Sequence, residues 1–171
     1  SLLLDKHGSL WVGTYFGGVN YSNISNNPII YYSNFSSDIL LSHRVIGQMI
    51  EDEKNNIWIA TEGGGLNYYN RDENSIRVFG ISDDSKGLSQ RNVKCLQLEK
   101  DFLLIGLYRG GLNIMDLKTK TFKRYIPSEF DKYAPETVWS ITNYYDKYLL
   151  GTTEGIIIFD PETEEFSRFI T

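Results

Sequence analysis

The chain has 171 residues and 41% of them are hydrophobic, which suits one globular domain with a substantial core. Aromatic residues make up 14% of the sequence and favour the half-buried surfaces of β-sheets. The net charge of -5 excludes nucleic acid as an expected partner, because phosphate binding needs a basic patch.

A motif near the N-terminus returns three times along the chain. Each copy is an apolar run, a turn with glycine and a second apolar run, at 10–21, 57–68, 103–114 and 148–159. Small residues hold one equivalent position in the four copies, with steps of 47, 46 and 45 residues: Gly13, Ala60, Gly106 and Gly151. This regular spacing indicates four structural repeats of one kind.

The second repeat shows most clearly how each unit is built. Apolar runs predict strands at 45–51, 56–61, 66–70 and 76–79, separated by turns rich in Asp, Asn, Ser and Gly. Four antiparallel strands in about 45 residues are typical of one β-propeller blade. The sequence therefore predicts an all-β fold of about four four-stranded antiparallel blades, at approximately 1–36, 41–82, 88–127 and 134–171.

A single blade cannot cover both of its faces, so blades pack against neighbours. Trp11 and Trp58 share one repeat position, which we interpret as packing between blades. We also expect Trp139 to lie in the core, and the alternative is that it lines the central channel. Four blades are about half of a seven-bladed ring. We expect the chain to belong to a larger, seven-bladed propeller, completed by remaining blades or by a second copy in a dimer; a closed four-bladed form is the alternative.

Several kinds of chemistry find little support in the sequence. Cys95 is the single cysteine, and we interpret it as a small buried side chain. His7 and His43 lie in different units without partners at metal-ligand spacing, so no metal or other cofactor is predicted.

Glycoside hydrolysis needs two carboxylates at a defined separation, whereas the acidic residues here fall mostly in hairpin turns such as that at Asp52, where we expect them to point to solvent. No stretch of 18 apolar residues occurs, so no direct membrane contact is expected.

The repeat resembles a known family. Residues 5–14 read DKHGSLWVGT and residues 17–21 read GGVNY, and the second unit matches through Asp52 and residues 55–61. This pattern resembles the two-component regulator propeller repeat, although the third and fourth units lack the Trp. The resemblance implies a periplasmic sensor region, in a membrane-anchored hybrid histidine kinase of Bacteroidetes, that responds to oligosaccharides.

Two sets of loops are expected to meet at one end of the propeller. One set links successive blades, at 41–44, 88–91 and 134–137, and the other joins the second and third strands of each blade. Their glycines recur while other residues vary, and varied positions on a fixed scaffold can carry specificity. The predicted ligand-binding residues are Tyr15, Phe16, His43, Arg44, Glu62, Gln90, Arg91, Tyr108, Arg109 and Glu154. In the alternative, these are ordinary loop residues, with Arg44 and Arg91 paired to carboxylates such as Glu62.

Three functions follow as hypotheses. The first is a non-catalytic, extracytoplasmic segment that senses an oligosaccharide. The second is a protein-interaction or dimerisation scaffold that transmits a signal without binding the ligand. The third is a propeller enzyme that acts on glycans.

Overall fold

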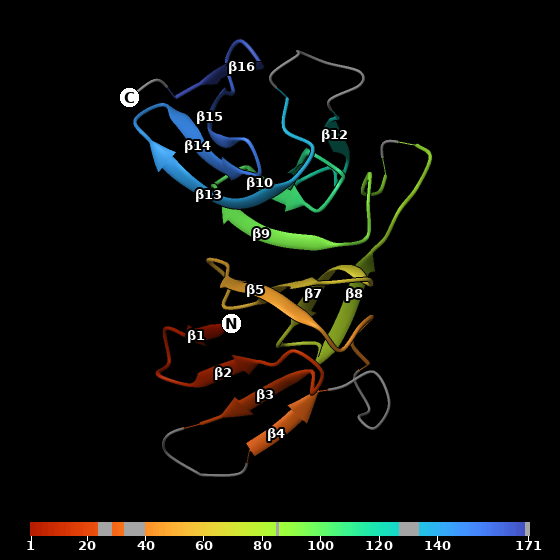
Figure 1. The fold of residues 1–171 in the computed structure, drawn as a ribbon. Coiled ribbons are helices and arrows are strands. Elements are labelled where there is room, and N and C mark those ends of the chain that lie inside the picture. Colours follow the sequence, from red (N-terminus) through yellow and green to blue (C-terminus); the bar gives the residue numbers. More distant parts are fainter. Residues whose placement is uncertain (24–28, 33–39, 85, 127–133, 170–171) are drawn as a thin grey trace. The chain divides into compact units, whose positions relative to one another are not determined.

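The computed structural model describes residues 1–23, 29–32, 40–84, 86–126 and 134–169. Every regular element in these ranges is a β-strand, and the strands form four separate four-stranded antiparallel sheets in chain order (Figure 1). The predicted all-β propeller fold is therefore confirmed. The described residues contain no helix that could span a membrane.

Contacts divide the chain into two compact units, residues 1–80 with 91–93 and residues 81–90 with 94–171. The first unit contains two sheets, with strands β1 (Leu2–Leu4), β2 (Leu10–Gly13), β3 (Val19–Ser22), β4 (Ile29–Tyr32), β5 (Ile46–Glu51), β6 (Ile57–Thr61), β7 (Gly65–Asn70) and β8 (Ser75–Phe79). The strands predicted for the second repeat lie within one residue of these bounds.

The second unit contains the other two sheets, with strands β9 (Val93–Leu98), β10 (Phe102–Leu107), β11 (Leu112–Asp116), β12 (Phe122–Tyr125), β13 (Val138–Tyr144), β14 (Lys147–Thr152), β15 (Gly155–Asp160) and β16 (Glu165–Arg168). Within each sheet, every strand pairs with the next one along the chain, as expected for a meander of short hairpins.

The core of the first unit lies between its two sheets. Trp11 is 2% exposed and packs in one cluster with Ile46 and Met49 of β5. A Cβ placed on Gly13 would lie 2.5 Å from Ile46 Cγ2, so a small residue at this repeat position lets β5 approach β2. Packing between blades, as predicted, is therefore confirmed for Trp11, and Trp58 is also buried, at 1% exposed.

The second unit repeats this arrangement. A Cβ on Gly106 would lie 2.3 Å from Cys95 Sγ and 2.9 Å from Val138 Cγ1, so β13 packs closely on β10 at this point. Cys95 is buried, as predicted, and burial raises the pKa of its thiol to about 12. Trp139 departs from prediction, because its side chain is 46% exposed rather than part of the core.

A buried polar network joins the two sheets of the first unit. Asp5 Oδ2 accepts hydrogen bonds from Trp11 Nε1 at 2.9 Å and from Arg71 Nη2 at 2.7 Å, and the backbone N–H of Ser9 donates to Oδ1. Burial tends to raise the pKa of Asp5, but hydrogen bonds from Trp11, Arg71 and Ser9 together with the Arg71 charge outweigh it and hold the pKa below its ordinary value.

Asp52, which holds the same position in the second sheet, does not simply point to solvent as predicted. It accepts hydrogen bonds from the backbone N–H of Asn56 and from the Tyr68 hydroxyl, each at 2.9 Å, and is only partly exposed. Burial and this bond raise the pKa of Tyr68 to about 12. The aspartate that opens each of these two repeats therefore closes its own hairpin turn.

Candidate functional site

The loops that link successive sheets are fixed by a buried asparagine. Asn67 Oδ1 accepts from the backbone N–H of Ser42 at 2.9 Å, and its Nδ2 donates to Ser42 Oγ at 2.6 Å. Asn113 and Ser89 make the same pair of bonds in the second unit, both at 2.9 Å. Because both asparagines are fully buried, these bonds satisfy polar groups that would otherwise be costly to bury.

The fourth repeat changes both partners together. Ile157 takes the place of the asparagine, and Pro135 takes the place of the serine. A buried asparagine without its serine would lose the partner of its amide, whereas an isoleucine needs none. This paired change supports the interpretation that the two residues act as one unit that positions the loop.

A second contact fixes each loop between strands. Gly18 N donates to Arg44 O at 3.1 Å, Gly65 N to Arg91 O at 2.9 Å and Gly111 N to Glu136 O at 3.0 Å. These glycines have φ values of 65°, 82° and 67°, a region that side chains disfavour. The recurring second glycine of the motif is therefore needed to bring the hairpin loop against the linking loop.

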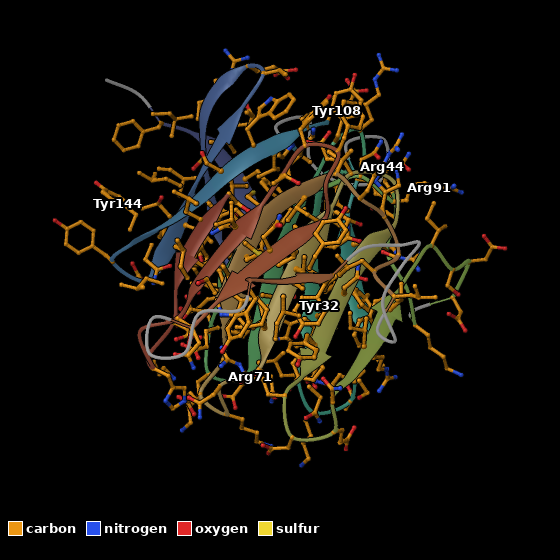
Figure 2. The ribbon with its side chains drawn as sticks, turned by 90° about the horizontal axis from the view of Figure 1, so that it is seen from below. Tyr32, Arg44, Arg71, Arg91, Tyr108 and Tyr144 are labelled. Atoms are coloured by element: carbon orange, nitrogen blue, oxygen red, sulfur yellow. The ribbon has the colours of Figure 1, made fainter. Side chains whose placement is uncertain are left out.

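In the first unit, these contacts bring three predicted residues together. The rings of Tyr15 and Phe16 meet edge to face at 4.6 Å and are 66% and 61% exposed. The Arg44 guanidinium lies 5.2 Å from the Phe16 ring centroid. Figure 2 shows Arg44 and Arg91 near one end of this unit, with Arg71 near the other.

The remaining predicted residues of the first unit help to hold its loops. His43 Nδ1 accepts from the backbone N–H of Val45 at 3.2 Å, and its ring covers Gly63, where a Cβ would lie 3.1 Å from Nε2. The backbone N–H of Glu62 donates to Val45 O at 3.0 Å. Arg91 contributes its carbonyl to Gly63 and Gly65, and its side chain is exposed.

The second unit contains a larger group, which we call the aromatic–cation group and define as Lys94, Tyr108, Arg109 and Trp139. The ring centroids of Tyr108 and Trp139 are 5.9 Å apart, with planes inclined at 55°. Lys94 Nζ lies 5.0 Å from the Trp139 centroid and 5.6 Å from that of Tyr108. The Arg109 guanidinium lies 5.5 Å from the Tyr108 ring.

Backbone contacts place Arg109 in this group. Its N–H donates to Thr137 Oγ1 at 3.1 Å, and its φ of 54° lies in the left-handed region. Arg109 Nε is 3.8 Å from Glu136 Oε1, and the two side chains are 67% and 64% exposed. Such an exposed ion pair is worth at most about 1 kcal/mol, so it leaves the guanidinium open to competition from a ligand.

The other two predicted residues of this unit lie outside the group among the residues that the structure describes. Gln90 packs against Gly110, where a Cβ would lie 2.6 Å from Gln90 Cβ. Glu154 lies in the turn between β14 and β15, and its N–H donates to Thr152 Oγ1 at 3.1 Å.

Sequence reasoning missed two members of the group. Lys94 and Trp139 each follow the first residue of an inner strand, β9 and β13, and the second repeat has Gly47 at that position. The sequence did contain a signal for both residues, because a charged or aromatic side chain stands where the second repeat has glycine. Repeat alignment alone does not show that the two strands bring these side chains together.

A pocket of about 470 Å³ also lies on the second unit, away from the loops. Phe102, Ile114 and Tyr125 line it, and the ion pair between Lys123 and Glu164 borders it. In the described part of the chain, no cluster of three His, Cys, Asp or Glu side chains could hold a metal ion.

The aromatic–cation group suits the recognition of a polar ligand with flat apolar faces. Exposed aromatic rings stack on such faces, while lysine and arginine donate hydrogen bonds to hydroxyl or acidic oxygens. Both rings and both cations stand on strands or on loops that backbone contacts hold in place. Ligand binding therefore costs little conformational entropy for ordering the loops.

Comparison with known proteins supports the resemblance noted in the sequence. The family model of the two component regulator propeller matches residues 40–63, which include the loop with His43 and Arg44. The resemblance to this repeat is therefore confirmed. No curated protein matches the sequence.

Solved structures show the same fold. The extracellular domain of one protein from B. thetaiotaomicron, described as a hybrid two component system, is 25% identical with a TM-score of 0.84, covering 99% of this chain and 24% of that chain. A second such domain from B. thetaiotaomicron is 20% identical, with the same TM-score and coverage. A computationally designed protein, Ika4, is 13% identical with a TM-score of 0.62, covering 93% of this chain and 88% of that one. The chain thus spans about a quarter of the length of its natural neighbours.

Proposed function

We propose that the chain is part of the periplasmic, ligand-sensing propeller of a hybrid two-component regulator and that it binds an oligosaccharide without transforming it. Catalysis would belong to a histidine kinase elsewhere in a membrane-anchored parent protein. The match to the regulator propeller repeat and the extracellular domains of similar fold support this proposal.

One observation carries the choice of ligand site. Trp139 is 46% exposed, and its ring lies against that of Tyr108. Tyr108 stands in the loop after β10, which the hydrogen bond from Arg109 N to Thr137 Oγ1 holds in place. Full burial of a large apolar side chain is worth about 1.5–3 kcal/mol, and Trp139 loses part of this benefit because it is partly exposed. A sugar ring stacked on Trp139 would recover part of that free energy on binding.

Another observation favours a partner on a different surface. Leu4 of β1 pairs with Leu10 of β2, so Leu2, Leu4 and Leu10 share one face of the first sheet, and they are 74%, 66% and 37% exposed. This apolar face fits another blade or a second copy of the chain, as the scaffold hypothesis requires. Sedimentation at increasing concentration tests it, and replacement of Leu4 by Ser is expected to weaken any self-association.

A thermal-shift screen with a panel of oligosaccharides tests ligand binding. A ligand present at 100 times its Kd is expected to stabilise the chain by about 2.7 kcal/mol. Trp139→Ala should abolish the shift. Tyr145→Ala, which removes an aromatic side chain that is 91% exposed beyond the far end of β13, should retain it.

Three outcomes would contradict the proposal. If no oligosaccharide shifts the transition while the chain associates with itself, the scaffold function stands instead. An equal shift in Trp139→Ala would show that the ligand binds elsewhere. Release of shorter sugars during incubation would indicate a glycan-active enzyme.

A further inference from the structure

We propose that the aromatic–cation group selects a saccharide that carries a negative charge, on a carboxylate or a sulfate. The inference rests on the proposed function and specifies the ligand class of the same site. Its basis is the position of two cations, Lys94 and Arg109, around the exposed rings of Tyr108 and Trp139.

Lys94 determines what a ligand meets at the rings. Its ammonium lies 5.0 Å from the Trp139 centroid and 5.6 Å from the Tyr108 centroid, within the range of a cation–π contact with each. A sugar that stacks on either ring therefore comes within reach of a positive charge. A ligand anion gains a charge-assisted hydrogen bond there, roughly twice as strong as the bond a neutral hydroxyl would accept.

Arg109 places a second cation beside Tyr108 in spite of a backbone cost. The structurally equivalent residue of the second repeat is Gly63, which also has a positive φ, at 118°. A residue with a side chain costs about 1–2 kcal/mol in the left-handed region, where glycine costs almost nothing. The exposed guanidinium offers a planar pair of N–H donors, a geometry that matches carboxylate and sulfate oxygens.

Two cations, Lys94 and Arg109, lie beside the rings of the group. Glu136 is the carboxylate that pairs with Arg109, and the side chains of that pair are 64% and 67% exposed. Both cations of the group belong to a chain whose net charge is -5. The second repeat has glycine at both equivalent positions, Gly47 and Gly63, so it carries neither cation there.

Isothermal titration with three galactose-based trisaccharides tests this inference. The first is trigalacturonate, the second its neutral counterpart galactotriose and the third a sulfated galactose trisaccharide. We expect at least about tenfold tighter binding of a charged ligand than of the neutral one, a difference of about 1.4 kcal/mol. The preference between the two charged ligands identifies the anionic group.

Arg109→Gly is the decisive variant, because it installs the residue that the second repeat already tolerates. It should fold at least as stably as the parent chain, lose about tenfold in affinity for the charged ligand and leave neutral binding unchanged. Lys94→Met, which keeps an apolar stem beside the rings, should act in the same direction. Lys123→Met removes a cation of the same unit that pairs with Glu164, and should change neither affinity.

The results separate this inference from the proposed function. If the neutral trisaccharide binds as tightly as the charged ones, or if Arg109→Gly weakens both equally, charge selection is wrong and saccharide binding stands. If a wide panel of neutral and charged saccharides gives no heat of binding, both are overturned.

Discussion

Arg71 Nη2 lies 2.7 Å from Asp5 Oδ2, and this ion pair joins the turn after β7 in one sheet to the turn after β1 in the neighbouring sheet. The Asp5 side chain is fully buried, and Arg71 also lies 5.0 Å from the Trp11 ring. The carboxylate therefore holds together a tryptophan, an arginine and its own hairpin turn. Glu51, whose Oε1 lies 3.5 Å from the same guanidinium, makes the arginine a shared partner of two carboxylates.

The lowered pKa of Asp5 predicts that the first unit becomes less stable in acid. Since the folded-state pKa lies below the ordinary value of 3.8, the stabilisation is complete at neutral pH and is lost as the pH falls below about 4 toward the lowered pKa. Asp5→Asn should lower the free energy of unfolding by about 3 kcal/mol at pH 7, since it leaves a largely buried arginine without its main partner. Urea unfolding at pH 7 and pH 3 measures both effects.

Asp84→Asn provides the control for this prediction. Asp84 also has a lowered pKa, mainly from its hydrogen bond with Ser82, but it lies at the surface. Its replacement should leave stability nearly unchanged at both pH values. A loss at pH 7 that is equal in the two variants would contradict the role assigned to the buried pair.

The pair of Asn113 and Ser89 should behave as one unit. Asn113→Ala and Ser89→Ala are each expected to lower the free energy of unfolding by about 1–3 kcal/mol, because each leaves a partly buried polar partner unsatisfied. The double variant should cost less than the sum of the two, by about 1 kcal/mol or more. Additive losses in a double-mutant cycle would show that the two bonds do not position the loop jointly.

The close approach at Gly106 predicts a steric cost for even one methyl group. Gly106→Ala should lower the free energy of unfolding by about 1–3 kcal/mol, because the added carbon meets Cys95 and Val138 in a packed core. Gly80→Ala, where nothing lies within 4 Å of an added Cβ, should be nearly neutral. Chemical denaturation of both variants tests this, and equal stabilities would contradict the packing described for β10 and β13.

Cys95 should react only when the second unit opens. Burial raises the pKa of its thiol to about 12, so at pH 8 roughly one molecule in ten thousand carries the thiolate. Modification with a coloured disulfide reagent should therefore be slow in buffer and complete in urea. Since Cys95 is the single cysteine, rapid labelling in buffer would directly contradict its burial.

The repeat made the scaffold predictable from the sequence. Steps of 45–47 residues, the small residue at one repeat position and the glycine turns indicated four sheets with strands of the right length, and the burial of Trp11 and Trp58 followed from their shared position. These features recur because every blade has the same packing and turn requirements. Repetition within one chain therefore supplies information that a single strand pattern does not.

The parts that differ between repeats were harder to predict. The repeated motif contains Asp5 but gives no sign that Arg71 of the next sheet reaches it across 66 positions of sequence. Trp139 was expected in the core because large aromatic residues are usually buried. Its exposure depends on which neighbour faces the start of β13, and a strand pattern does not contain that information.

Tryptophan fluorescence tests the proposed ligand site most directly. Of the three Trp residues in the chain, Trp11 and Trp58 are 2% and 1% exposed, so quenching by acrylamide should report almost entirely on Trp139. An oligosaccharide that binds at the aromatic–cation group should protect this fluorescence in a saturable way, and Trp139→Phe should remove the quenchable component. If a saccharide binds by calorimetry while Trp139 remains as accessible to acrylamide as in the free chain, the ligand site has been placed wrongly.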